Sequence, residues 1–138
     1  MDGDIEIIEG IGPVYGKQLR SVGISWVKEL LEQGGSANGR KQLVEKTGLT
    51  HDQILKWVNH ADLLRIKGMT PDWAELLEEA GVDTVKELKT RVAENLHEKL
   101  KAVNPKNPQG SYARTVPDLA TVQAWIDQAT SLTPKVTY

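Results

Sequence analysis

Hydrophobic positions in this chain recur with the spacing of an α-helix rather than that of a β-strand. Near the C-terminus the apolar positions follow at i, i+3, i+4, i+7 and i+10: Val122, Trp125, Ile126, Ala129 and Leu132. The same spacing occurs in an earlier block: Ile54, Trp57, Val58, Ala61 and Leu64. Such spacing places the apolar side chains on one face of a helix. Residues 5–9, with the sequence IEIIE, are the one ambiguous run. We therefore predict an all-α fold of about ten short helices.

Proline and capping residues divide this pattern into separate helices. Pro71 suits the first turn of a helix, where its missing N–H is not needed. Thr50 and Gln53 have the spacing of a capping box, in which each side chain satisfies a free backbone N–H of the other residue. Ser25 and Asp83 are the expected N-caps of the two short helices that follow the glycine stops.

The sequence contains an internal duplication. A shift of 58 positions aligns residues 8–30 with residues 66–88 without a gap, and both segments end in VKEL. A shift of 68 positions aligns residues 54–64 with residues 122–132. Because the two shifts differ by ten, the second copy carries an insertion between its two aligned blocks.

These alignments predict the organisation of the domain. We assign the insertion to residues 104–117, because prolines and a glycine indicate an irregular loop there. The first repeat then spans residues 1–64 and the second spans residues 65–132, followed by a C-terminal tail of residues 133–138. We expect about five short helices in each repeat, with both repeats packed as one compact unit.

Each repeat contains a glycine-rich turn before a proline. Residues 8–12 are called the first glycine turn below, and residues 66–70 the second glycine turn. The first turn contains Gly10-Ile11-Gly12 and precedes Pro13, with the small residue Gly16 one helical turn later. Paired glycines allow positive φ angles, and the turn amides with the next helix N-terminus form a concavity that attracts anions. This pattern resembles the helix-hairpin-helix motif, whose DNA-binding members receive a backbone phosphate in that concavity.

The chain as a whole resembles one tandem helix-hairpin-helix family, which is catalogued only as a domain of unknown function. The resemblance covers roughly residues 6–132 and rests on the two turns and on three further segments: GRKQLVEKTGL, ILKWVNHADLLRIKG and ENLHEKL. It implies a helical fold and no established catalytic residue. It does not imply a particular function.

The first glycine turn and the insertion supply the candidate residues for binding nucleic acid. Amides of the turn would bind a phosphate, with two basic side chains one helical turn later. The insertion adds basic residues in a segment without acidic ones. The candidate nucleic-acid-binding residues are Gly10, Ile11, Gly12, Lys17, Arg20, Lys106 and Arg114.

The second glycine turn departs from the phosphate-binding pattern. Thr70 replaces its second glycine, and a helix with several acidic residues follows: Asp72, Glu75, Glu78 and Glu79. Acidic side chains near a helix N-terminus already interact with the dipole that would attract a phosphate. We therefore expect the second turn to be structural.

Composition and charge restrict the possible functions. The formal net charge is −2 with a pI of about 5.9, so phosphate binding would depend on a local basic patch. The absence of cysteine excludes disulfides and Cys-ligated metal sites. No apolar run approaches the ~18 residues of a membrane span, and the acidic N-terminus does not resemble a secretory signal. We therefore expect a cytoplasmic protein without a membrane partner.

The sequence gives little support for catalysis. His51, His60 and His97 are scattered, and neither a P-loop nor a dinucleotide fingerprint is present. We predict that the protein is not an enzyme and uses no metal, cofactor or small-molecule substrate.

Two of the four tryptophans occupy matching positions in the aligned blocks. Trp57 and Trp125 share the apolar face of corresponding helices, so we interpret them as core residues rather than base-stacking platforms. Trp26 has no aromatic counterpart, because Thr84 stands at the corresponding position. Trp26 is therefore the best candidate for an exposed aromatic side chain.

Two functional hypotheses remain. The first is a non-catalytic module that binds the backbone of duplex DNA or RNA weakly and without sequence preference, through the first glycine turn. The second is a protein–protein interaction or scaffold module, including head-to-tail self-assembly, with no nucleic-acid role. The motif favours the first hypothesis, and the acidic charge balance favours the second.

Overall fold

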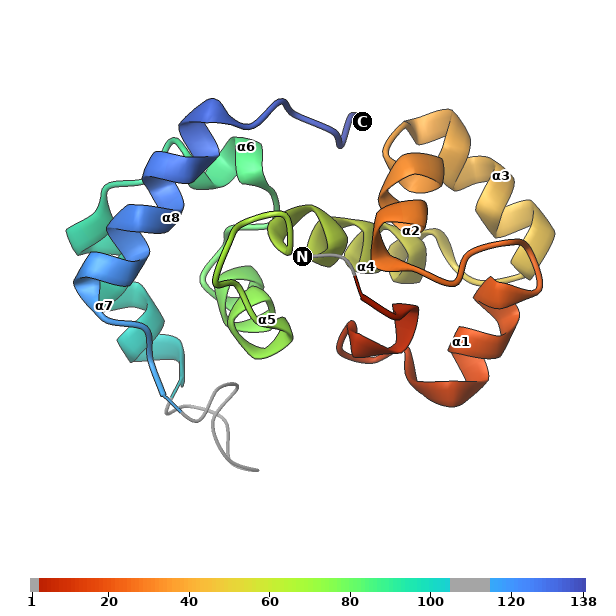
Figure 1. Cartoon of the computed structure of the whole chain (residues 1–138), viewed down its shortest axis with the longest axis horizontal. Coiled ribbons are helices and arrows are strands. Elements are labelled where there is room, and N and C mark those ends of the chain that lie inside the picture. The colour runs from red at the N-terminus through yellow and green to blue at the C-terminus, as the bar shows by residue number, and fades with distance from the viewer. Residues whose placement is uncertain (1–2, 105–114) are drawn as a thin grey trace.

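The computed structural model describes residues 3–104 and 115–138 of the chain. These residues form eight α-helices and one short 3₁₀ helix (Figure 1). In chain order they are η1 (Ile5–Ile7), α1 (Gly12–Arg20), α2 (Val27–Gly34), α3 (Ala37–Thr47), α4 (His51–Leu63), α5 (Pro71–Glu79), α6 (Val85–Leu88), α7 (Ala93–Val103) and α8 (Leu119–Ser131). The described ranges contain no strand, only an isolated antiparallel bridge between Asp4 and Trp26. The predicted all-α fold is confirmed, and the ambiguous IEIIE run contributes η1.

Helix α4 lies at the centre of the molecule. It packs against α2 and α3 on one side and against α5 on the other, while α8 packs against α6 and α7 (Figure 1). Apolar side chains from all of these helices join in a single buried cluster that continues through α4. The expected compact unit is therefore confirmed. None of the helices in the described ranges has the length and apolar character needed to cross a membrane.

The capping box predicted at the start of α4 is present. Thr50 Oγ1 accepts a hydrogen bond from the Gln53 N–H at 3.1 Å, and Gln53 Oε1 accepts from the Thr50 N–H at 3.0 Å. Two orphan amides are thereby satisfied at the N-terminus of the central helix.

The caps predicted for α2 and α6 are wrong by one residue. Thr84, rather than Asp83, caps α6, because its hydroxyl accepts from the Glu87 N–H at 3.2 Å. At α2 the N-cap is Trp26 rather than Ser25. The Ser25 and Trp26 N–H groups, just before α2, donate to a side chain within the helix, the Glu29 carboxylate.

The C-terminal tail, residues 133–138, returns from α8 toward the half of the molecule that contains α2 and α3 (Figure 1). Its Thr137 N–H donates to the Gly35 carbonyl at 2.8 Å, and the Thr137 carbonyl accepts from the Arg40 guanidinium. Val136 is buried in the common core. The tail therefore connects the two ends of the fold.

Candidate nucleic-acid interface

The first glycine turn has the backbone geometry expected of a phosphate-binding turn. Gly10 has a φ of 90° and Gly12 a φ of 60°, in the left-handed region that favours glycine. Ile11 between them is buried, and its N–H donates to the Ile8 carbonyl at 3.2 Å. Ile11 therefore anchors the turn in the core, and its amide is not available to a ligand.

The start of α1 carries no side-chain cap. Its N-cap is Ile11, whose side chain cannot accept a hydrogen bond, and Pro13 has no N–H. The Gly12 and Val14 amides find no acceptor among the described residues. A Cβ built at Gly12 would meet no atom within 4 Å, so the backbone there is open to a partner. These open amides lie at the positive end of the helix dipole.

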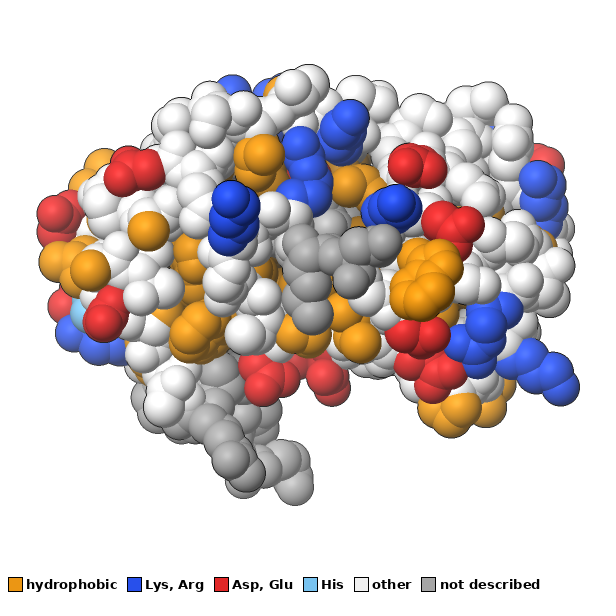
Figure 2. Space-filling view, in the orientation of Figure 1, with side chains coloured by type: hydrophobic (Ala, Val, Ile, Leu, Met, Phe, Trp, Pro, Cys, Tyr) orange, Lys and Arg blue, Asp and Glu red, His pale blue; other side chains and the backbone are white. Residues whose placement is uncertain are grey.

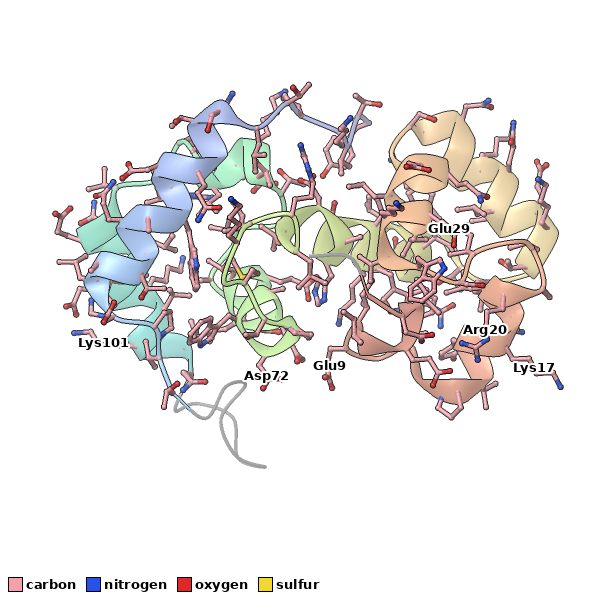
Figure 3. All side chains as sticks on the ribbon, viewed as in Figure 1. Glu9, Lys17, Arg20, Glu29, Asp72 and Lys101 are labelled. Atoms are coloured by element: carbon pink, nitrogen blue, oxygen red, sulfur yellow. The ribbon has the colours of Figure 1, made fainter. Side chains whose placement is uncertain are left out.

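The two basic side chains predicted beside this turn differ in their surroundings. Arg20 Nη2 binds Glu6 Oε2 at 2.7 Å, and Arg20 Nη1 lies 3.8 Å from Asp4 Oδ1. Lys17 is exposed and forms no ion pair with a described carboxylate; it points outward from the molecule in Figure 3. The role of Glu6 could not be predicted from the sequence, because 14 positions separate it from Arg20 and only the fold brings them together.

The side of the first turn that faces α5 is acidic. Glu9 lies on this side, away from Lys17 and Arg20 (Figure 3). Burial, and secondarily the charge of Glu9, raises the pKa of Glu75 on α5. A phosphate would therefore meet least repulsion from the opposite side, where Lys17 lies.

The second glycine turn is closed by its own side chain. Gly68 has a φ of 84°, but Thr70 has an ordinary φ of −119°, so this turn has one left-handed residue instead of two. The Thr70 hydroxyl accepts from the Trp73 N–H at 3.1 Å and caps α5. The Trp73 N–H, one of the first amides of α5 and a possible anion donor, is thus already used within the chain.

Aromatic side chains support the helices rather than an exposed stacking surface. Tyr15 packs on Trp57 with ring centroids 5.3 Å apart, and Trp73 packs on Trp125 at 5.4 Å. Trp57 and Trp125 are buried, as predicted. Trp26 is 50% exposed, which confirms the prediction of an exposed aromatic side chain at this position.

The remaining candidates lie in the predicted insertion. Lys106 and Arg114 fall outside the described residues, so their place relative to the first glycine turn is not defined. Gly10 and Lys17 are thus exposed, Gly12 is half-buried at the start of the helix that carries Lys17, and Arg20 is paired with acidic residues. In the described part of the chain, no three His, Cys, Asp or Glu side chains are arranged to hold a metal ion.

Comparison with known proteins identifies a family. The family model described as "Domain of unknown function (DUF4332)" matches residues 9–132, which include residues 9–12 of the first glycine turn, the whole second turn and α1 to α8. Searches among curated proteins and among solved structures gave no significant match. Because the family model covers most of the chain, the protein belongs to the DUF4332 family.

Proposed function

We propose that the chain is a tandem helix-hairpin-helix protein that acts by binding rather than by catalysis. The helix bounds support the duplication, since α4 and α8 both have 13 residues and α3 and α7 both have 11. The aromatic pairs support it as well: Tyr15 with Trp57 corresponds to Trp73 with Trp125 under the two sequence shifts. Aromatic side chains matched by the two sequence shifts therefore make similar contacts, which supports the proposed duplication.

The molecular role we propose is weak, sequence-independent contact with a nucleic-acid backbone through the first glycine turn. The uncapped start of α1 carries this proposal: two left-handed glycines leave the Gly12 and Val14 amides open, with Lys17 exposed nearby. The second turn serves as an internal contrast, because the N–H of Trp73, the third residue of α5, donates to the Thr70 hydroxyl, whereas the N–H of Val14, the third residue of α1, has no acceptor among the described residues.

Several charges limit the affinity of such a contact. Arg20 is paired with Glu6, and Glu9 lies on the flank of the turn that faces α5. One helix-hairpin-helix turn contacts only about one or two phosphates, so binding would be weak and would fall steeply with added salt. The net charge of −2 adds repulsion at long range.

Fluorescence anisotropy with a labelled duplex at low salt tests this role. Lys17→Glu reverses the exposed charge beside the turn, and we expect it to lower the affinity roughly fivefold or more. Lys41→Glu makes the same charge change at an exposed site on α3 and should alter the affinity by less than about twofold. Equal effects of the two variants would reject a specific role for the first turn.

A second candidate function is assembly with a protein partner or with further copies of the chain, head to tail. Its specific support is the exposure of large apolar side chains: Trp26 is 50% exposed and Val14, beside the first turn, is 71% exposed. Helix α8 packs on α6 and α7, on the opposite side of α4 from α1, so the chain's own last helix does not cover the first turn (Figure 1). Light scattering at high protein concentration would reveal self-assembly, and a strict monomer would reject that form of the hypothesis.

A further inference from the structure

A pocket between the two halves of the molecule gathers basic side chains from three distant segments. Lys28 of α2, Arg65 after α4 and Lys135 of the tail line a cavity of ≈ 550 Å³. Glu32 is the one carboxylate among its described lining residues. In Figure 2, Lys and Arg side chains gather in the upper middle of the face, near the tail and α2. On a chain with a net charge of −2, this local excess of cations favours an anionic ligand.

Arg65 is held in place by a buried carboxylate. Its Nη1 donates to Asp62 Oδ1 at 2.8 Å, and the Asp62 side chain is only 2% exposed. The other oxygen of Asp62 accepts from the Val85 N–H at 2.9 Å, which fixes the carboxylate in turn. The Nε and Nη2 groups of Arg65 donate to no described protein atom. A guanidinium fixed at one nitrogen can offer its remaining donors to a planar or tetrahedral anion with little loss of side-chain entropy.

Backbone and hydroxyl groups add to the wall of the pocket. Ser36 lines it and is also the N-cap of α3, where its Oγ accepts from the Gly39 N–H at 3.0 Å. The Ser36 hydroxyl hydrogen therefore remains available for donation. The positive end of the α3 dipole lies at the same place, at the edge of the basic cluster.

The tail completes the pocket. The Thr137 N–H donates to the Gly35 carbonyl, and the tail backbone runs so close that a Cβ at Gly35 would lie 2.5 Å from the Lys135 carbonyl oxygen. This close approach brings Lys135 into the pocket lining together with Arg65 and Lys28. Residue 35 must therefore be glycine for the third cation to reach the site.

We propose that this pocket binds a phosphate-bearing anion. Its volume exceeds that of a single phosphate group, so it fits a ligand with more than one phosphate or a phosphate carried on a larger group. Such a ligand can be a free polyphosphate compound or the backbone of a nucleic acid. The proposal is independent of the first glycine turn, whose residues do not line this pocket.

An NMR titration of the whole chain with inorganic pyrophosphate at low ionic strength tests the proposal. We expect saturable shifts of the Gly35, Ser36 and Lys135 amide signals. Lys28→Glu combined with Lys135→Glu should lower the affinity ~10-fold or more, because two of three cations are reversed. The matched control, Lys41→Glu combined with Lys89→Glu, makes the same charge change at exposed residues outside the pocket and should lower the affinity less than about threefold.

Two other results would contradict the binding of a phosphate-bearing anion in this pocket. An absence of these shifts up to ~10 mM pyrophosphate, or an equal loss in the control variant, would overturn the proposal. A parallel titration with a short duplex identifies the source of the phosphate. Shifts of the same amides with both probes indicate a nucleic-acid backbone, whereas shifts with pyrophosphate alone indicate a free ligand. Lys17→Glu should leave pyrophosphate binding unchanged, which separates this site from the first glycine turn.

Discussion

Arg40 is 1% exposed, and its guanidinium satisfies three backbone carbonyls from two distant parts of the chain. Nη1 donates to the Gly34 and Gly35 carbonyls at 3.0 and 2.8 Å, and Nη2 donates to the Thr137 carbonyl. The guanidinium also lies 5.6 Å from the centre of the Tyr138 ring. A buried cation on α3 thereby fixes both the end of α2 and the C-terminal tail.

Replacing this side chain tests its contribution to stability. Arg40→Met keeps much of the apolar stem but removes the guanidinium donor from the Gly34 and Thr137 carbonyls and one of the two donors from the Gly35 carbonyl, which should lower the free energy of unfolding by about 3 kcal/mol. Lys41→Met, at the exposed neighbouring position, should change it by less than about 0.5 kcal/mol. Urea unfolding of both variants measures the difference. A stability of Arg40→Met equal to that of the wild type would contradict the role of Arg40.

The carboxylate of Glu78 makes the stability depend on pH. Burial by itself raises the pKa of Glu78, but His60 Nε2 at 3.3 Å and Lys56 Nζ at 3.5 Å outweigh it, so the pKa lies below its ordinary value. A carboxylate with a lowered pKa in the folded state stabilises the fold above its unfolded pKa of about 4.3, and this contribution is lost as pH falls.

Glu78→Gln removes that ionisation. The variant should be less stable than the wild type at pH 6 to 7, and the difference should shrink toward zero as the pH falls to ~3. Urea unfolding at a series of pH values measures it. A stability difference that stays constant over this range would show that the charge of Glu78 does not contribute.

At the scale of helices and turns, the sequence predicts local features well and tertiary contacts poorly. The capping box at Thr50 and the burial of Trp57 follow from local spacing, and both are confirmed. Asp83 and Thr84 are both good capping residues, so sequence alone does not decide which hydroxyl or carboxylate meets the helix amide. The pairing of Arg20 with Glu6 depends on how η1 packs against α1, which no local pattern encodes.

That pairing gives a prediction for the first glycine turn. Glu6→Gln removes the carboxylate that binds Arg20 and frees the guanidinium for a phosphate, which should strengthen duplex binding roughly threefold at low salt. Glu45→Gln changes the net charge equally at an exposed site on α3 and is the control. Anisotropy titrations of both variants measure the effect. An equal gain in the control would mean that net charge alone controls binding.

At the scale of the whole molecule, α4 contributes to both halves of one core. Its buried residues contact helices on either side, and the tail adds a second connection through Arg40. We therefore expect the two halves of the molecule to unfold together. Helical circular dichroism and tryptophan fluorescence should give coincident urea transitions, because the tryptophans lie in both halves. Two separate transitions would show that the halves fold independently.

The basic pocket likewise depends on the fold of the whole molecule. Lys28, Arg65 and Lys135 come from three segments with no shared motif, and only the docking of the tail places them around one cavity. The first glycine turn, which is continuous in sequence, could therefore be predicted, but this pocket could not. Sites assembled from distant segments require the fold before they can be recognised.

We propose that, of the two glycine turns, the first alone retains the ability to bind a backbone phosphate. The most direct measurement is an NMR titration of the chain with a short duplex at low salt, in which the two turns are compared within one sample. We predict shifts of the Gly10, Gly12, Val14 and Lys17 amides that disappear with added salt, and no comparable shifts at residues 68–73. Unchanged signals at the first turn, or equal shifts at both turns, would contradict the claim.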